Sequence, residues 1–287
     1  MKKINLLVLL LLAGLFSAQE VNRFFYEMTF KPSKDSANKV EKELTVLDVW
    51  KDKSVYRDYM AVSQDSLMKA FMEQVKKTGN MFDQEKFGLK QGKFTYSIVK
   101  PYPIKEVAYE DFILEKKFVY KEPVKLDWKI ETEKATIENY STQKATTSFG
   151  GRNWVAWFTT DIPFADGPYK FYGLPGLIVK IEDTQNHYQW VLKGNEKLSE
   201  EKATPYSEKM MKEFGMGNGI EVTREKFDKA YQAYKQDPFA SIKTHFNNPA
   251  MKEYKLPDGS YFVDKIKEAE VKLKKFLNEN NNPIELK

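Results

Sequence analysis

The chain of 287 residues has no cysteine and only two histidines, His187 and His245. Without cysteine it cannot form disulfides, thiol nucleophiles or cysteine-based zinc sites. A histidine-based zinc site needs two or three histidines with carboxylates nearby, and these two lie far apart in the sequence. A Ser-His-Asp triad would lack the G-x-S-x-G elbow that marks one common class. We therefore expect no metal and no cofactor, and we assign no catalytic residue.

Charge of one sign is not concentrated in any part of the chain. The 46 Lys and Arg residues are mixed with 41 Asp and Glu residues, which leaves a net charge of +5. No dense basic block of the kind that follows a phosphate backbone is present. We therefore expect no nucleic-acid partner. Long apolar runs are also missing after residue 16, so we expect no transmembrane segment in the mature chain.

The first 18 residues have the three parts of a secretory signal peptide. Lys2 and Lys3 give a basic start, residues 4–16 form an apolar run, and Ala18 precedes a polar stretch. The apolar run is shorter than the roughly 20 residues that span a bilayer. We place cleavage after Ala18 and predict export to the periplasm or the extracellular space.

The dominant pattern in the rest of the chain is alternation of apolar and polar residues. This period of two is typical of strands in an antiparallel sheet that is covered on one face and wet on the other. The fold class expected is mainly β (α+β), with a curved, half-barrel-like antiparallel sheet of about ten strands. The strand candidates are residues 24–30, 43–50, 54–60, 94–98, 112–120, 124–131, 136–149, 152–160, 177–182 and 188–192.

Helical spacing of apolar residues occurs in three segments. These predict amphipathic helices over residues 65–77, 223–235 and 262–276, the last two in the C-terminal part. We expect a sheet domain over residues 19–199, a glycine-containing loop over 200–222 and a helical part over 223–287 that packs on the sheet. The last ten residues, 278–287, are expected to fray.

Residues 145–183 form the most distinctive stretch. Pro175-Gly176 suits a type II turn, in which proline sets φ and glycine supplies a positive φ. Leu174 and Leu177 flank this turn and should be buried. A structural role in the turn is therefore assigned to Gly173, Leu174, Pro175, Gly176 and Leu177.

This stretch resembles the GLPGLI family of exported proteins from Gram-negative bacteria. The resemblance rests on ordered elements: Gly-Gly-Arg at 150–152, Ala-Trp-Phe-Thr at 156–159, Gly-Pro-Tyr-Lys-Phe at 167–171 and Gly-Leu-Pro-Gly-Leu-Ile at 173–178. It implies export and a mainly β fold, but no assigned activity. Many members carry a cysteine just before a Gln-Lys-Ala-Thr element, where this chain has Thr142.

The candidate ligand-binding residues lie in the same stretch. Four aromatic side chains would form an apolar wall, and one arginine would be a polar anchor for a carboxylate or phosphate. The arginine could equally tie a strand end to Asp161 or Asp166. The five candidates are Arg152, Trp154, Trp157, Tyr169 and Phe171.

Three functions are compatible with these features. A binding or carrier module would hold a lipid, peptide or glycan in an apolar hollow between the curved sheet and its helices. A structural or assembly factor would bind a protein partner at the cell envelope. A hydrolase would use paired carboxylates, for which the candidates are Asp161, Asp166, Glu182 and Asp183. We favour the binding module because no catalytic set is recognisable.

Overall fold

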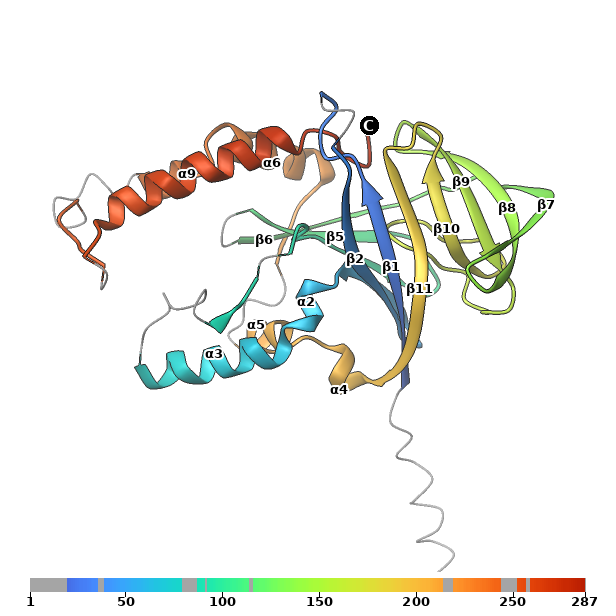
Figure 1. The fold of residues 1–287 in the computed structure, drawn as a ribbon, viewed down its shortest axis with the longest axis horizontal. Helices are drawn as coiled ribbons and strands as arrows, with labels where there is room; N and C mark the ends of the chain where they lie inside the picture. Colours follow the sequence, from blue (N-terminus) through green and yellow to red (C-terminus); the bar gives the residue numbers. More distant parts are fainter. Residues whose placement is uncertain are drawn as a thin grey trace, which may run out of the picture.

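The computed structural model describes residues 20–35, 39–78, 87–90, 92–113, 116–213, 219–243, 252–256 and 259–286. They form one 12-stranded sheet in the order β12-β6-β5-β4-β3-β2-β1-β11-β10-β9-β8-β7. All neighbouring strands pair antiparallel except β12 and β6, which are parallel. Figure 1 shows the sheet strongly curved, with helices grouped beside one half of it. The expected α+β class with a curved antiparallel sheet is confirmed. The predicted signal peptide lies outside the described residues.

The strands are mostly short segments with the alternating pattern seen in the sequence. Their bounds are β1 Glu20–Phe30, β2 Glu41–Val49, β3 Lys53–Asp58, β4 Ser97–Pro101, β5 Val107–Ile113, β6 Lys116–Glu122, β7 Lys129–Ile137, β8 Tyr140–Phe149, β9 Arg152–Thr159, β10 Leu177–Asp183, β11 Tyr188–Ser199 and β12 Ile220–Glu221.

One face of the sheet carries the main core, and alternation along β1 decides which residues reach it. Phe24, Tyr26, Met28 and Phe30 are all buried in this core, as predicted, whereas Val21 joins a separate cluster with Trp50. Trp190 of β11 donates its indole N–H to the hydroxyl oxygen of Tyr56 on β3, at 2.8 Å. These two strands are three positions apart and would lie about 14 Å apart in a flat sheet. The contact therefore fits a sheet that curls toward this inner face.

The helices lie where their apolar stripes can meet the sheet or each other. Their bounds are α2 Met60–Ser63, α3 Asp65–Thr78, α4 Glu200–Ala203, α5 Tyr206–Glu213, α6 Arg224–Gln236, α7 Ala240–Lys243 and α9 Phe262–Glu279. The three predicted helices correspond to α3, α6 and α9.

Helix α6 shows how the sequence sets one of these positions. Thr223 caps it by accepting from the backbone N–H of Lys226. Phe227 then packs on Tyr109 of β5 and Tyr120 of β6. No helix among the described residues combines the length and apolar character needed to cross a membrane.

Four local predictions are wrong. The single strand predicted over residues 112–120 consists of the end of β5 and the start of β6, which pair antiparallel with each other. Residues 123–128 are not paired in the sheet; the Trp128 indole donates to the carbonyl of Tyr172, and the Tyr172 hydroxyl donates to the carbonyl of Val124. The single strand predicted over residues 136–149 is a hairpin, in which residues 138–139 turn between β7 and β8 and Glu138 has φ +49°. The loop predicted over residues 200–222 contains α4, α5 and β12, and Ala203 is fully buried.

Candidate functional site

The inner face of the curved sheet is covered by the chain itself. Residues 160–176, which connect β9 to β10 and are called the insert below, fold back onto this face. Phe171 of the insert is fully buried, and its ring lies 4.8 Å from that of Trp154 on β9. Tyr169 stacks on Trp190 at 6.4 Å. Two of the aromatic residues expected to form a ligand wall, Tyr169 and Phe171, therefore belong to the insert and pack on tryptophans of the sheet.

Trp157 does not belong to this wall. It lies one residue out of phase with Trp154 and Phe158, which are buried in the main core, and it is only half-buried. Lys144 of β8 lies over its ring at 5.9 Å. Of the five predicted ligand residues, the structure thus brings together Trp154, Tyr169 and Phe171, and it places Trp157 on the opposite face.

In the turn that ends the insert, the flanking leucines are buried as predicted. The turn itself is not of the predicted type II. Leu174 and Leu177 are buried in the main core. Gly176 has φ +152°, which is positive but far from the roughly +80° of a type II turn. Its N–H donates to the carbonyl of Leu174, so the turn is a tighter three-residue one. Gly173 also has a positive φ, and Pro175 is exposed.

A buried ion pair holds the middle of the insert. Lys100 of β4 is fully buried and donates to the carboxylate of Asp166 and to the carbonyl of Gly167. The hydroxyl of Tyr102 donates to the other carboxylate oxygen. Burial lowers the pKa of Lys100, and the charge and hydrogen bond of Asp166 only partly offset this. Asp166 therefore positions the insert and faces no open space.

Asp166→Asn is expected to lower the free energy of unfolding by about 2 kcal/mol, because Lys100 loses the charge of its partner but keeps an oxygen acceptor. Asp161→Asn is the matched control: it lies on an exposed turn, and its effect should stay within about 0.5 kcal/mol. Urea unfolding followed by tryptophan fluorescence compares the two. Equal effects would contradict a structural role of Asp166.

Three of the four carboxylates expected for a hydrolase have separate partners, and the fourth, Asp161, is exposed. Asp183 is buried and binds Arg152, and it also accepts from the backbone N–H groups of His187 and Tyr188. Glu182 lies on the outer face and pairs with Lys180. Among the described residues, no group of three or more His, Cys, Asp or Glu side chains could hold a metal ion.

Arg152 is the centre of the arrangement that we regard as the candidate site. It is 5% exposed, and its ion pair is with Asp183 instead of Asp161 or Asp166. Its other nitrogens bind the C-terminal end of the chain. They donate to the carbonyl of Ile284 at 2.9 Å, the carbonyl of Pro283 at 2.8 Å and the side-chain oxygen of Asn282 at 2.8 Å. A guanidinium group suits this task because it presents five N–H donors in a fixed fork.

Residues 281–286, called the tail below, run over this arginine and bend at Ile284. The N–H of Leu286 donates to the carbonyl of Gly150, and the hydroxyl of Tyr188 donates to that of Asn282. Asn282 also reaches Lys31 and Pro32 after β1. Asn282 and Ile284 are buried at 4% and 7% exposure. The expectation that the C-terminus frays is wrong for the described residues, because backbone and side chains are both fixed.

The acidic side chain of the tail lies in a basic and aromatic pocket. Glu285 accepts from the hydroxyl of Tyr169 and from Lys170, both at 2.6 Å, and pairs with Arg224 of α6 at 2.9 Å. Lys170 is fully buried and also binds Glu122 of β6. Burial raises the pKa of Glu285, but Lys170 and Tyr169 outweigh it, so this pKa lies below its usual value.

His187 adds a titratable group next to the tail. Arg152 lies 3.2 Å from its Nδ1, and because arginine has only donors, this nitrogen acts as an acceptor. Burial lowers the pKa of His187, and the charge of Arg152 lowers it further. Protonation of the ring would place two cations against each other.

We therefore expect stability to fall between pH 7 and pH 5 in the wild type more than in His187→Gln. The folded-state pKa is depressed, so the unfolded chain, with its histidine pKa of about 6.5, binds the proton first as pH falls. Stability is complete above that value and declines toward the folded pKa. Urea unfolding at several pH values measures this difference, and parallel curves for the two proteins would contradict it.

Sequence reasoning identified Arg152 and the aromatic residues but missed their partners. Lys100, Lys170 and Glu285 look like ordinary surface charges in a chain with 30% charged residues. The signal that was available is position: Lys170 lies between Tyr169 and Phe171, two residues expected to be buried. The alternating apolar residues Ile284 and Leu286 gave a similar but weaker sign for the tail.

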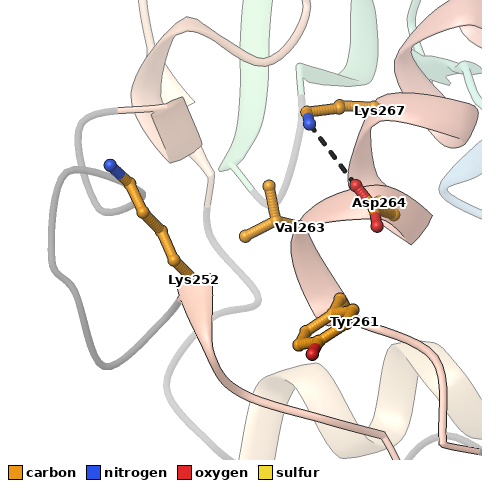
Figure 2. A pocket seen from close by; sticks show the side chains of 5 residues that line it. All are labelled: Lys252, Tyr261, Val263, Asp264 and Lys267. Atoms are coloured by element: carbon orange, nitrogen blue, oxygen red, sulfur yellow. Dashed lines mark hydrogen bonds and ion pairs between the residues drawn. The ribbon is translucent and has the colours of Figure 1, made fainter.

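A separate surface cleft lies at the start of α9 (Figure 2). It has a volume of about 420 Å³ and is lined by Lys252, Tyr261, Val263, Asp264 and Lys267. Asp264 and Lys267 pair with each other at 3.4 Å, and Lys252 and Tyr261 are exposed. This cleft is open and has no buried polar side chain pointing into it, so it is a weaker candidate than the tail site.

Comparisons with known proteins connect this region to a family of unknown function. A family model described as "Protein of unknown function (Porph_ging)" matches residues 150–180. The match includes Gly150, Arg152 and the whole insert. No match was found among curated proteins.

Among solved structures, the chain is similar to PNGF-II in two crystal forms. Identity is 16% and 15%, the TM-score is 0.47 for both, 74% of this chain is covered, and 33% and 32% of the other chain. The chain thus spans about a third of the length of PNGF-II. A domain from Vibrio parahaemolyticus described as an outer membrane lipoprotein-sorting protein is 7% identical, with a TM-score of 0.21, and the match covers 68% of this chain and 93% of that domain.

Proposed function

We propose that this protein is an exported, non-catalytic binding module of the GLPGLI type, and that its ligand is a polypeptide segment. The observation that carries the proposal is the contact set of Arg152. This buried arginine donates three hydrogen bonds to the backbone and to one side chain of a polypeptide segment, its own tail. We propose that the tail occupies in cis the groove that another polypeptide occupies in trans.

Peptide is the ligand class that these contacts favour among lipid, peptide and glycan. Extended peptides are recognised by hydrogen bonds to their backbone and by pockets for some of their side chains. The tail uses both, because Gly150 and Arg152 bind its backbone while Ile284 enters the main core. A segment of another envelope protein would satisfy the same groups, and this would also give the module a role in assembly.

The close approach of the tail depends on a glycine in the matched segment. Gly150 has φ +59°, and a Cβ atom there would lie 2.8 Å from the Cγ of Glu285. Any other residue at this position would push the tail away from the sheet. A glycine at this point is thus suited to a groove into which a polypeptide fits closely.

A full-length Ile284→Ser variant tests the proposal, because it removes the apolar anchor of the tail without removing the tail. Labelled peptide with the sequence of residues 281–287 should bind this variant saturably in fluorescence anisotropy. The wild-type chain should bind it more weakly because its intact tail competes, and a scrambled peptide should not bind. Circular dichroism checks that the variant is folded. If the folded variant binds neither peptide, the groove is not a peptide site.

A further inference from the structure

The pocket around Glu285 differs from the rest of the groove because it contains two cations. Lys170 reaches it from the insert and Arg224 reaches it from α6. Glu122 of β6 pairs with both of these cations, at 2.6 Å and 2.8 Å. With the tail in place, two positive charges therefore face two negative charges.

Removal of the tail would upset this balance. Lys170 and Arg224 would then share the single carboxylate of Glu122, with Asp228 reaching only Arg224, at 3.9 Å. Lys170 is fully buried, and a buried cation that loses a partner is costly unless another anion replaces it. The empty pocket would therefore favour an acidic group over a neutral one.

The surroundings of the pocket limit which acidic group can enter. The rings of Tyr109, Tyr120 and Tyr169 lie around the Lys170 ammonium at 5.3–5.5 Å. The hydroxyl of Tyr169 adds a directed donor to the carboxylate. The buried site of Ile284 lies one residue before it. Together these features require a carboxylate on the bound segment and a buried aliphatic residue directly before it.

We infer that Tyr169, Lys170 and Arg224 form a carboxylate-binding pocket, which selects peptides that carry an acidic side chain directly after a buried aliphatic one. This inference rests on the proposed function, since it names the class of peptide that the same groove takes. The tail sequence Asn-Pro-Ile-Glu, residues 282–285, is the pattern that it recognises in cis.

The test compares two peptides on the full-length Ile284→Ser chain. One has the sequence of residues 281–287, and the other has glutamine at the position of Glu285. We expect the glutamine peptide to bind at least about tenfold more weakly, because it loses charge-assisted hydrogen bonds. Sodium acetate and free glutamate, at concentrations similar to that of the peptide, should not compete, since the pocket binds a carboxylate that is part of a peptide. Competition by either would show that the pocket is a site for free anions.

A matched pair of variants tests whether Arg224 is one of the cations that bind the peptide carboxylate. Arg224→Gln and Lys229→Gln each remove one positive charge from α6, but Lys229 is exposed and pairs with Glu225. The difference between the two peptides should shrink in the Arg224 variant and remain in the Lys229 variant. Equal affinities of the two peptides for the parent chain would overturn the inference while leaving the peptide groove in place. Binding of neither peptide would instead reject the proposed function.

A second measurement covers the case in which Ile284→Ser does not fold. In the intact chain, Glu285→Gln should raise the hydrogen-exchange rates of residues 281–286 at least about tenfold, and Glu279→Gln, which alters an exposed carboxylate at the end of α9, should not. Unchanged exchange in Glu285→Gln would overturn the inference without any peptide being added.

Discussion

Arg152→Ala should lower the free energy of unfolding by about 3–5 kcal/mol and release the C-terminal tail. Removal of one partner from a buried ion pair leaves the other charge without compensation, and such changes cost about this much. Here Asp183 is 1% exposed and would keep only its two backbone donors. The carbonyls of Pro283 and Ile284 would lose their donors at the same time.

Two measurements separate these effects. Urea unfolding gives the change in stability, and hydrogen exchange of residues 281–286 reports on the tail. Lys193→Ala is a suitable control, because Lys193 forms an exposed ion pair with Glu138, and such surface pairs contribute about 0–1 kcal/mol. An Arg152→Ala protein whose tail remains as protected as in the wild type would show that the arginine does not hold the tail, and it would weaken the proposed groove.

The sheet could be predicted from the sequence because each strand carries its own alternating pattern. Phe24, Tyr26, Met28 and Phe30 reach the core through a local rule that needs no knowledge of their partners. Helix α6 was predictable for a similar reason, since its N-cap and its apolar stripe lie within the same short segment. Patterns of this kind fix which face of an element is buried.

The same local rule fails where a segment packs on an irregular surface. Residues 124–131 alternate as a strand would, and Val124 is buried while Lys125 is exposed. The segment nevertheless covers the insert and has no strand partner until β7 begins at Lys129. Burial alternation alone therefore does not distinguish a paired strand from an unpaired segment that packs on another part of the chain.

The candidate site was only half predictable, because its defining contacts join distant parts of the chain. Arg152 is about 130 residues from the tail that it binds, and Lys100 reaches the insert from β4. A sequence pattern marks a residue type and its spacing, but it cannot give the partner that satisfies a buried charge. Trp154, Tyr169 and Phe171 lie together in the structure, but no local pattern indicates that the insert, which carries two of them, folds back onto the sheet.

Gly176→Ala is the second substitution from which we expect a large loss of stability. A Cβ atom on Gly176 would lie 2.0 Å from the carbonyl oxygen of Thr159 and 2.7 Å from its carbon, both of them backbone atoms at the end of β9. The φ of +152° is also unfavourable for a residue with a side chain. Backbone strain of about 1–3 kcal/mol and overpacking of similar size together give about 3–5 kcal/mol.

Gly194→Ala is the matched control for this substitution. Gly194 lies in β11 of the same sheet, its φ is not positive, and a Cβ atom there would meet nothing within 4 Å. We expect a change within about 1 kcal/mol, with stabilisation allowed because alanine restricts the unfolded chain. Thermal and urea unfolding of both variants measure the difference in stability.

If the two variants were equally stable, the close contact at Gly176 would not explain why the Gly-Leu-Pro-Gly-Leu-Ile turn has a glycine at this position. If only Gly176→Ala lost stability, the turn would be shown to seat the insert against β9 by close backbone approach, with Leu174 and Leu177 held in the core on either side of it.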